Sequence, residues 1–131
     1  MIQRPYSTPH NNRIKHRTKK EHNKGGSRAD ANILDLDTGV DDALAISYAL
    51  GSPEVELIGI TGTYGNVLVE QGVRNALAVT DLLGHPEVSV YPGLDRPSTA
   101  PESFRYSPSA GTRRIHGDNG IGDVDIPDSN R

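Results

Sequence analysis

The feature that most constrains the fold is an alternation of short apolar runs and longer amphipathic segments between residues 32 and 91. Apolar runs of strand length cover residues 33–37, 55–60 and 88–91, and helices are predicted from Ala43 to about Leu50 and from Asn66 to Gly84. Strand, helix, strand, helix, strand predicts right-handed crossovers and a parallel sheet. The near-continuous apolar character of the strands predicts helices on both faces. We therefore expect an α/β fold with an open, mostly parallel sheet.

The ends of the two predicted helices carry recognisable signals. Asp41 and Asp42 suit the positive end of a helix dipole, and Gly51 with Pro53 is typical of a helix end. Asn66 is a candidate N-cap of the second helix, although an active-site role competes with that interpretation. The inward face of this second helix is predicted to include Val67, Val73, Leu77 and Leu83, and Gly84 ends it.

The charge is unevenly distributed along the chain. Residues 1–31 hold eight Lys or Arg against two acids, whereas residues 32–131 hold six against fifteen. The first segment has no apolar period, so we interpret it as a disordered basic arm preceding a domain at 32–131. Its basic cluster at residues 15–20 is compatible with a nucleic-acid contact or a targeting signal. Because short basic runs match by chance often, we favour a plain extension and expect no nucleic-acid partner.

Cysteine is absent, which excludes disulfides and thiolate sites. No apolar run approaches the roughly 20 residues that cross a bilayer, and the N-terminus lacks the apolar core of a secretory signal. These features predict a soluble cytoplasmic protein without membrane contacts. Residues 92–114 are rich in Pro, Ser, Gly and Arg, and a loop of that length is usually functional or disordered. A compact glycine-rich element follows at residues 115–123.

Four acids fall within eight residues as D-x-D-x-G-x-D-D, from Asp35 to Asp42. Like charges at this density repel unless a cation or protons compensate them, and Ca²⁺ or Mg²⁺ prefers such oxygen ligands. A tight turn at Gly39 would bring Asp37 and Asp42 together. Ligands of parallel α/β sheets bind beyond the carboxyl ends of the strands. Asp37, the loop at 61–66 and the segment after Tyr91 should all lie there.

Three other interpretations of the acids compete with a metal site. An EF-hand loop needs glycine at position six and glutamate at position twelve, where this chain has Val40 and Ile46. A haloacid-dehalogenase-like phosphatase also has D-x-D after an apolar strand. Its usual Thr is replaced by Gly39, and the pair Asp41-Asp42 has no place in that pattern. Simple helix capping would need one or two acids rather than four. We therefore favour the metal site.

The segment ILDLDTGVDDALAI at residues 33–46 resembles the N-terminal signature of the inosine-uridine nucleoside hydrolase family. The resemblance continues in order through residues 58–66, 74–76, 90–93 and 116–120, and it covers about residues 32–124. Thr38 departs from the proline that the family usually has there. The resemblance implies a Rossmann-like sheet, truncated relative to the nucleoside hydrolase fold.

The resemblance also implies a role for each matched residue. Asp37 would be a metal ligand and the general base, Asp42 a bidentate calcium ligand, and Asp41 a ribose contact. Asn66 would be the active-site asparagine, His116 would line the ribose 5′ side, and Asp35 would play a supporting part. Together they would hydrolyse the N-glycosidic bond of a ribonucleoside, with Ca²⁺ as cofactor, through an oxocarbenium-like transition state.

Family members are more than twice as long, and their later residues supply further ligands. We therefore expect this chain to be a truncated form with weak or no activity. A non-catalytic module that binds a divalent cation or ribose stays open as an alternative. A split enzyme completed by a separate C-terminal half, and a homo-oligomer, also stay open. Base preference does not follow from these residues.

Overall fold

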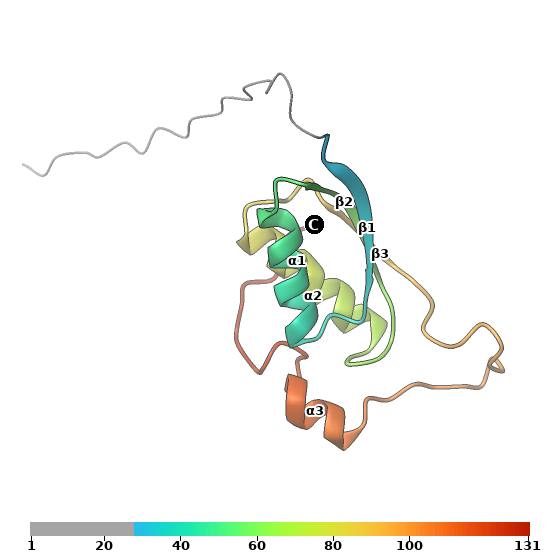
Figure 1. The fold of residues 1–131 in the computed structure, drawn as a ribbon. Helices are drawn as coiled ribbons and strands as arrows, with labels where there is room; N and C mark the ends of the chain where they lie inside the picture. The colour runs from blue at the N-terminus through green and yellow to red at the C-terminus, as the bar shows by residue number, and fades with distance from the viewer. Residues whose placement is uncertain (1–27) are drawn as a thin grey trace, which may run out of the picture.

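The computed structural model describes residues 28–131, and Figure 1 shows their course. The elements in order are β1 (Asp30–Leu36), α1 (Val40–Gly51), β2 (Val55–Gly62), α2 (Val69–Leu82), β3 (Ser89–Pro92) and α3 (Ala110–His116). β1 begins ahead of the predicted domain start at residue 32, and most of the predicted basic arm lies outside the described residues. None of the helices in residues 28–131 has the length and apolar character needed to cross a bilayer.

The three strands form one parallel sheet in the order β1-β2-β3, as the alternating pattern predicts. Leu34, Ile60 and Val90 lie side by side in one row of this register. The next row holds Asp35, Thr61 and Tyr91 on the opposite face, because successive side chains of a strand alternate between faces. The pairing of β1 with β2 shifts register between Asn32 and Ile33, where Ile58 has no partner in β1.

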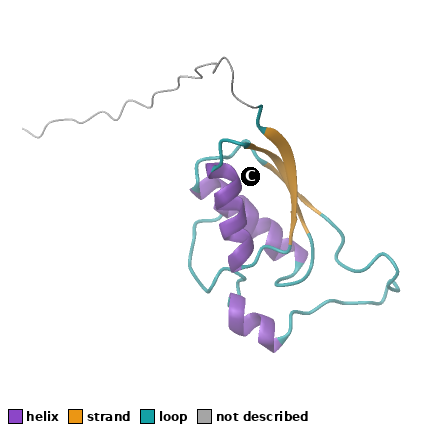
Figure 2. Ribbon diagram, in the orientation of Figure 1, coloured by secondary structure: helices purple, strands orange, loops and turns teal. Residues whose placement is uncertain are grey.

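Both long helices cover the same face of the sheet, so the prediction of cover on both faces is wrong for residues 28–131 (Figures 1 and 2). A sheet that grows in one direction places successive right-handed crossovers on one side. The core lies between this face and the helices, and it consists of Ile46, Ile60, Ala76, Val79 and Val88. On the other face Ile33 is 63% and Tyr91 61% exposed.

The start of α2 differs from the prediction. Its N-cap is Leu68 rather than Asn66, and the Asn66 side chain is bonded elsewhere. Val67 is buried as predicted, but it precedes the helix. Leu83 is exposed rather than inward-facing, because it caps the C-terminal end of α2. Local helix propensity did not decide this boundary, because the Asn66 side chain bonds Asp37 instead of capping α2.

Helix α3 lies inside a segment that the sequence pattern predicts to be irregular. Ser109 caps it by accepting a hydrogen bond from the Thr112 amide at 3.0 Å. The helix has no buried residue, so its sequence has no apolar period from which a helix could be predicted. It lies beyond the carboxyl ends of the strands, beneath the start of α1 (Figure 1).

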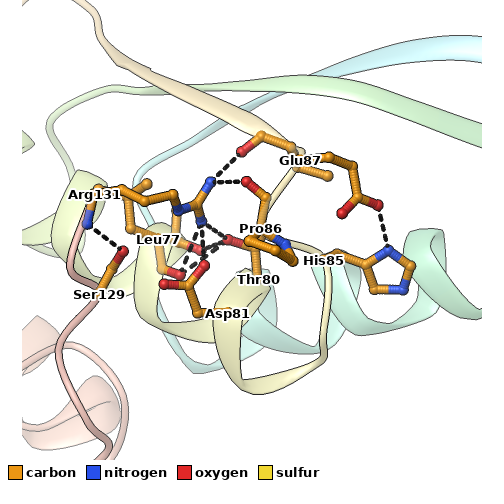
Figure 3. A network of polar contacts seen from close by, with 10 residues as sticks. Leu77, Thr80, Asp81, His85, Pro86, Glu87, Ser129 and Arg131 are labelled. Carbon is orange, nitrogen blue, oxygen red and sulfur yellow. Dashed lines mark hydrogen bonds and ion pairs between the residues drawn. The ribbon is translucent and has the colours of Figure 1, made fainter.

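Arg131 joins the end of α2 to the start of β3 (Figure 3). Its guanidinium donates to the carbonyls of Pro86 and Val88 at 2.7 and 2.8 Å and to Thr80 Oγ1 at 2.8 Å. It also forms an ion pair with Asp81 at 2.7 Å. One side chain therefore satisfies several polar groups at the amino end of the sheet.

Candidate active site

The acidic motif forms the turn between β1 and α1. Asp37 follows β1 directly, and Thr38 is fully buried behind it. Gly39 is the N-cap of α1, and its amide donates to Asp42 Oδ2 at 3.1 Å. Asp41 and Asp42 occupy the first helical turn, where the helix dipole favours negative charge. Strand and helix thus position the acids at the carboxyl end of the sheet.

Asp37 is held from the other side by the loop that follows β2. The Asn66 amide donates to Asp37 Oδ2 at 2.5 Å, and Asn66 Nδ2 donates to Oδ1 at 3.2 Å. A Cβ added at Gly65 would lie 1.9 Å from Asp37 Oδ2, so only glycine permits this approach. Both oxygens of the Asp37 carboxylate are therefore oriented by one asparagine.

Asp37 and Asp42 lie next to each other. Burial raises the pKa of Asp42 to about 6, and its hydrogen bond with Asp37 and the charges of Asp37 and Asp41 act in the same direction. The hydrogen bond from the Gly39 amide opposes this shift. Because ionisation of Asp42 is costly beside a second carboxyl, a cation would be favourable at this place.

His116 reaches the same turn from α3. Its Nδ1 accepts a hydrogen bond from the Val40 amide at 3.2 Å and lies 3.7 Å from Asp41 Oδ1. A Cβ added at Gly39 would lie 2.5 Å from Asn66 Nδ2 and 2.6 Å from His116 Nδ1. Side chains from two other segments, the loop after β2 and α3, therefore converge over Gly39.

Asp35 does not join this group. Its side chain is exposed on the sheet face that lacks helices, and it accepts a hydrogen bond from Thr61 Oγ1 at 2.6 Å. The alternation of β1 explains this position, since Leu34 and Leu36 on either side pack against the core. Of the six predicted site residues, five meet at the turn and Asp35 lies apart.

Two tyrosines that sequence reasoning missed border the site. The Tyr106 hydroxyl donates to the Gly65 carbonyl at 2.5 Å, and its ring lies 5.0 Å from that of Tyr64. This contact joins the long loop before α3 to the turn that orients Asp37. The length of that loop was the available signal, because loops of this length are often functional.

Asp37 and Asp42 present carboxylate oxygens at the turn, and such ligands suit Ca²⁺ or Mg²⁺. In residues 28–131, however, no three His, Cys, Asp or Glu side chains are grouped so that they could hold a metal ion. Asp37 and Asp42 are the two carboxylates whose proximity fits a shared cation. This part of the chain thus presents a partial set of ligands.

Comparison with known proteins places the chain among relatives of one family. The family model described as inosine-uridine preferring nucleoside hydrolase matches residues 32–131. An uncharacterised protein of Corynebacterium ammoniagenes is 52% identical over 94 residues, which are 72% of this chain and 95% of that protein. The inosine-uridine preferring nucleoside hydrolase of Crithidia fasciculata is 42% identical over 95 residues, which are 72% of this chain and 28% of that protein.

A solved structure shows the same likeness in three dimensions. The purine-preferring ribonucleoside hydrolase from Gardnerella vaginalis superimposes with a TM-score of 0.74 and 72% sequence identity. The match covers 78% of this chain and 31% of that one, so the chain spans less than a third of both named hydrolases. The chain belongs to the inosine-uridine preferring nucleoside hydrolase family.

Proposed function

We propose that this chain carries the carboxylate side of a site that hydrolyses the N-glycosidic bond of ribonucleosides, releasing ribose and a free base. The observation that supports this most is the double hydrogen bond from Asn66 to Asp37, beside Asp42. An oriented carboxylate at the carboxyl end of a parallel sheet is well placed to act on a bound ligand.

In the proposed mechanism Asp37 is the general base that takes a proton from the attacking water. Because Asn66 bonds both of its oxygens, the Asp37 carboxylate is held in one orientation before substrate arrives. The transition state of glycoside hydrolysis resembles an oxocarbenium ion, and the negative charge of the Asp37–Asp42 pair would stabilise it. Asp41 is exposed and free to accept a hydrogen bond from a ribose hydroxyl, and His116 stands beside it.

We propose Ca²⁺ as the cofactor, held in part by Asp37 and Asp42. When bound it would supply positive charge that relieves the carboxylate repulsion, orients ribose hydroxyls and makes a water more acidic. Two carboxylates form an incomplete calcium site, since Ca²⁺ takes about 6–8 oxygen ligands. We therefore expect residues 28–131 alone to bind calcium weakly and to hydrolyse ribonucleosides slowly at most.

A non-catalytic module that binds a divalent cation or ribose is the second candidate. The presence of only two adjacent carboxyls limits catalysis but favours this candidate. The pair, with its raised Asp42 pKa, attracts a cation whether or not hydrolysis takes place. Completion of the site by a further polypeptide or by a second copy of the chain is compatible with either candidate.

The test combines calorimetry and ribose release on the purified 131-residue chain. We would titrate calcium and ribose and follow hydrolysis of inosine and uridine with and without calcium. Asp37→Asn and Asp42→Asn probe the site, and Glu54→Gln removes an exposed acid at the amino end of the sheet as the matched control. The proposal expects calcium heat that Glu54→Gln retains and both site variants lose, with slow hydrolysis that depends on calcium.

Three outcomes would decide between the candidates or count against them. Calcium heat without any hydrolysis favours the binding module over the enzyme. Absence of heat with both calcium and ribose counts against both, and hydrolysis that survives Asp37→Asn contradicts the assignment of the general base.

A further inference from the structure

Asn75 lies on α2, outside the acidic turn, and its side chain links two loops of the candidate site. It is 3% exposed. Its Nδ2 donates to the Thr38 carbonyl at 3.3 Å and to the Asn119 carbonyl at 2.8 Å. Its Oδ1 accepts from Gln71 Nε2 at 2.8 Å, so hydrogen bonds to neighbours on both sides fix the amide orientation.

The two carbonyls belong to the segments that carry the acids and the histidine. Thr38 stands between Asp37 and Gly39, and Asn119 follows shortly after His116. The Thr38 carbonyl is buried, so the loss of its donor would leave a polar group without water or protein to pair it. The helix therefore determines where both segments lie.

The loop after His116 is rigid enough to transmit that position. Asn119 Oδ1 accepts from the amides of Ile121 and Asp123 at 3.0 and 2.9 Å. The Gly122 amide donates back to the His116 carbonyl at 2.7 Å. Displacement of Asn119 would therefore move the backbone of His116 as well.

Glycine at residue 120 allows the loop to approach Asn75 closely. Gly120 has a φ of 83°, and an added Cβ would lie 3.0 Å from Asn75 Nδ2 and 3.2 Å from the Thr38 carbonyl. The same Cβ would lie 2.4 Å from Val67. The loop, the acidic turn and α2 therefore meet with no room for a side chain between them.

We propose that Asn75 is a positioning residue that sets His116 against Asp41 and the Asp37 turn by bonding to both loops. It touches neither the reacting atoms nor the proposed metal ligands. The positioning role of Asn75 stands on the geometry alone, and only its effect on hydrolysis rests on the proposed function.

The experiment compares Asn75→Asp with Thr80→Val in the full chain. Asn75→Asp keeps the size of the side chain but removes both N–H donors and places negative charge against two carbonyls. Thr80 is the matched control, because it is also fully buried and hydrogen-bonded on α2 but lies near Arg131 rather than the site. Gly120→Ala disturbs the contact between Asn75 and the two loops from the loop side, without a substitution in α2.

The first readout is amide hydrogen exchange, measured at an equal interval below the Tm of each variant. We expect the Val40 amide, which donates to His116 Nδ1, and the Gly122 amide to exchange about tenfold faster in Asn75→Asp and Gly120→Ala. Thr80→Val should leave both unchanged despite its lower stability. Equal exchange in Thr80→Val and Asn75→Asp would overturn the proposal.

The second readout is hydrolysis of inosine and uridine. The proposal expects kcat to fall about tenfold more in Asn75→Asp than in Thr80→Val, with a smaller change in KM. Equal kcat losses in the two variants would show that Asn75 acts through packing alone. If the wild-type chain releases no ribose, the proposed function fails for this chain, and the exchange experiment still decides the role of Asn75.

Discussion

The two ends of the sheet carry polar networks of opposite character. At the amino end one guanidinium, that of Arg131, faces carbonyls, a hydroxyl and Asp81, so its positive charge is compensated (Figure 3). At the carboxyl end the carboxyls of Asp37 and Asp42 face each other, and the pKa of Asp42 is raised. Removing one partner from a network of matched charges is costly, whereas a network with unmatched charges is favourable only when something binds.

The difference assigns each network a role. The amino-end contacts close the connection between α2 and β3 and are complete within the described residues. The carboxyl-end acids lower the stability of the protein until a cation or a proton joins them. Removal of a charged group should therefore lower the free energy of unfolding at the amino end and raise it at the carboxyl end.

Arg131→Ala should have the largest effect, a loss of about 2–3 kcal/mol in the free energy of unfolding. The substitution removes donors from two carbonyls and Thr80 and leaves Asp81 without its cation. Denaturant unfolding would measure the loss. Arg131→Lys restores the charge without the fork of donors, so it should recover part of the stability; full recovery would show that charge alone matters.

Gly65→Ala should cost about 1–2 kcal/mol, because the new Cβ would overlap Asp37 Oδ2 and displace either the carboxylate or the loop. It should also abolish any calcium heat in calorimetry. Gly51→Ala is the matched control, since nothing lies within 4 Å of a Cβ added there. If Gly65→Ala retains calcium binding, then calcium binding does not depend on the Asn66–Asp37 contact.

Asp42→Asn should stabilise the metal-free protein at neutral pH by about 1 kcal/mol, after allowance for solvent screening of a half-buried carboxyl. The pKa of Asp42 is raised in the folded state, so wild type loses stability relative to this variant as the pH rises from 3.8 to about 6. Above that range the difference should be constant. Thermal unfolding in a chelator across this pH range would measure it.

The same scan, repeated with calcium, tests whether the two ends of the sheet differ. Calcium should reverse the order, because it binds the wild-type pair and not the variant. If Asp42→Asn destabilises the metal-free protein at neutral pH, the carboxyl end is an ordinary structural network like the amino end.

Asp128→Asn should have the smallest effect and leave the Tm unchanged within error. Arg74 lowers the pKa of Asp128 through their hydrogen bond, so any contribution is present near neutral pH and disappears as the pH falls through the Asp128 pKa. Both side chains are exposed, and such pairs contribute little. A clear decrease in the Tm of Asp128→Asn would show that exposed ion pairs stabilise the protein as much as the Arg131 network does.

Local patterns predicted much of the fold. The apolar runs, together with end signals such as Gly51, indicated the strands and the first two helices close to their observed bounds. Helix α3 and the start of α2 escaped this reasoning, as did the bare face of the sheet. Helix α3 buries no side chain and so shows no apolar period. The start of α2 moved past Asn66 because Asp37, distant in the chain, bonds that side chain.

The sequence by itself determined the parallel α/β topology and the acidic turn, because strand periodicity, helix dipoles and glycine turns act over a few residues. Only the tertiary structure brought His116 to Val40 and Asn75 to both loops, and it left Asp35 on the opposite face. Those contacts join residues far apart in the chain. They depend on which face of each element the core buries, and no local pattern reports how buried elements finally pack.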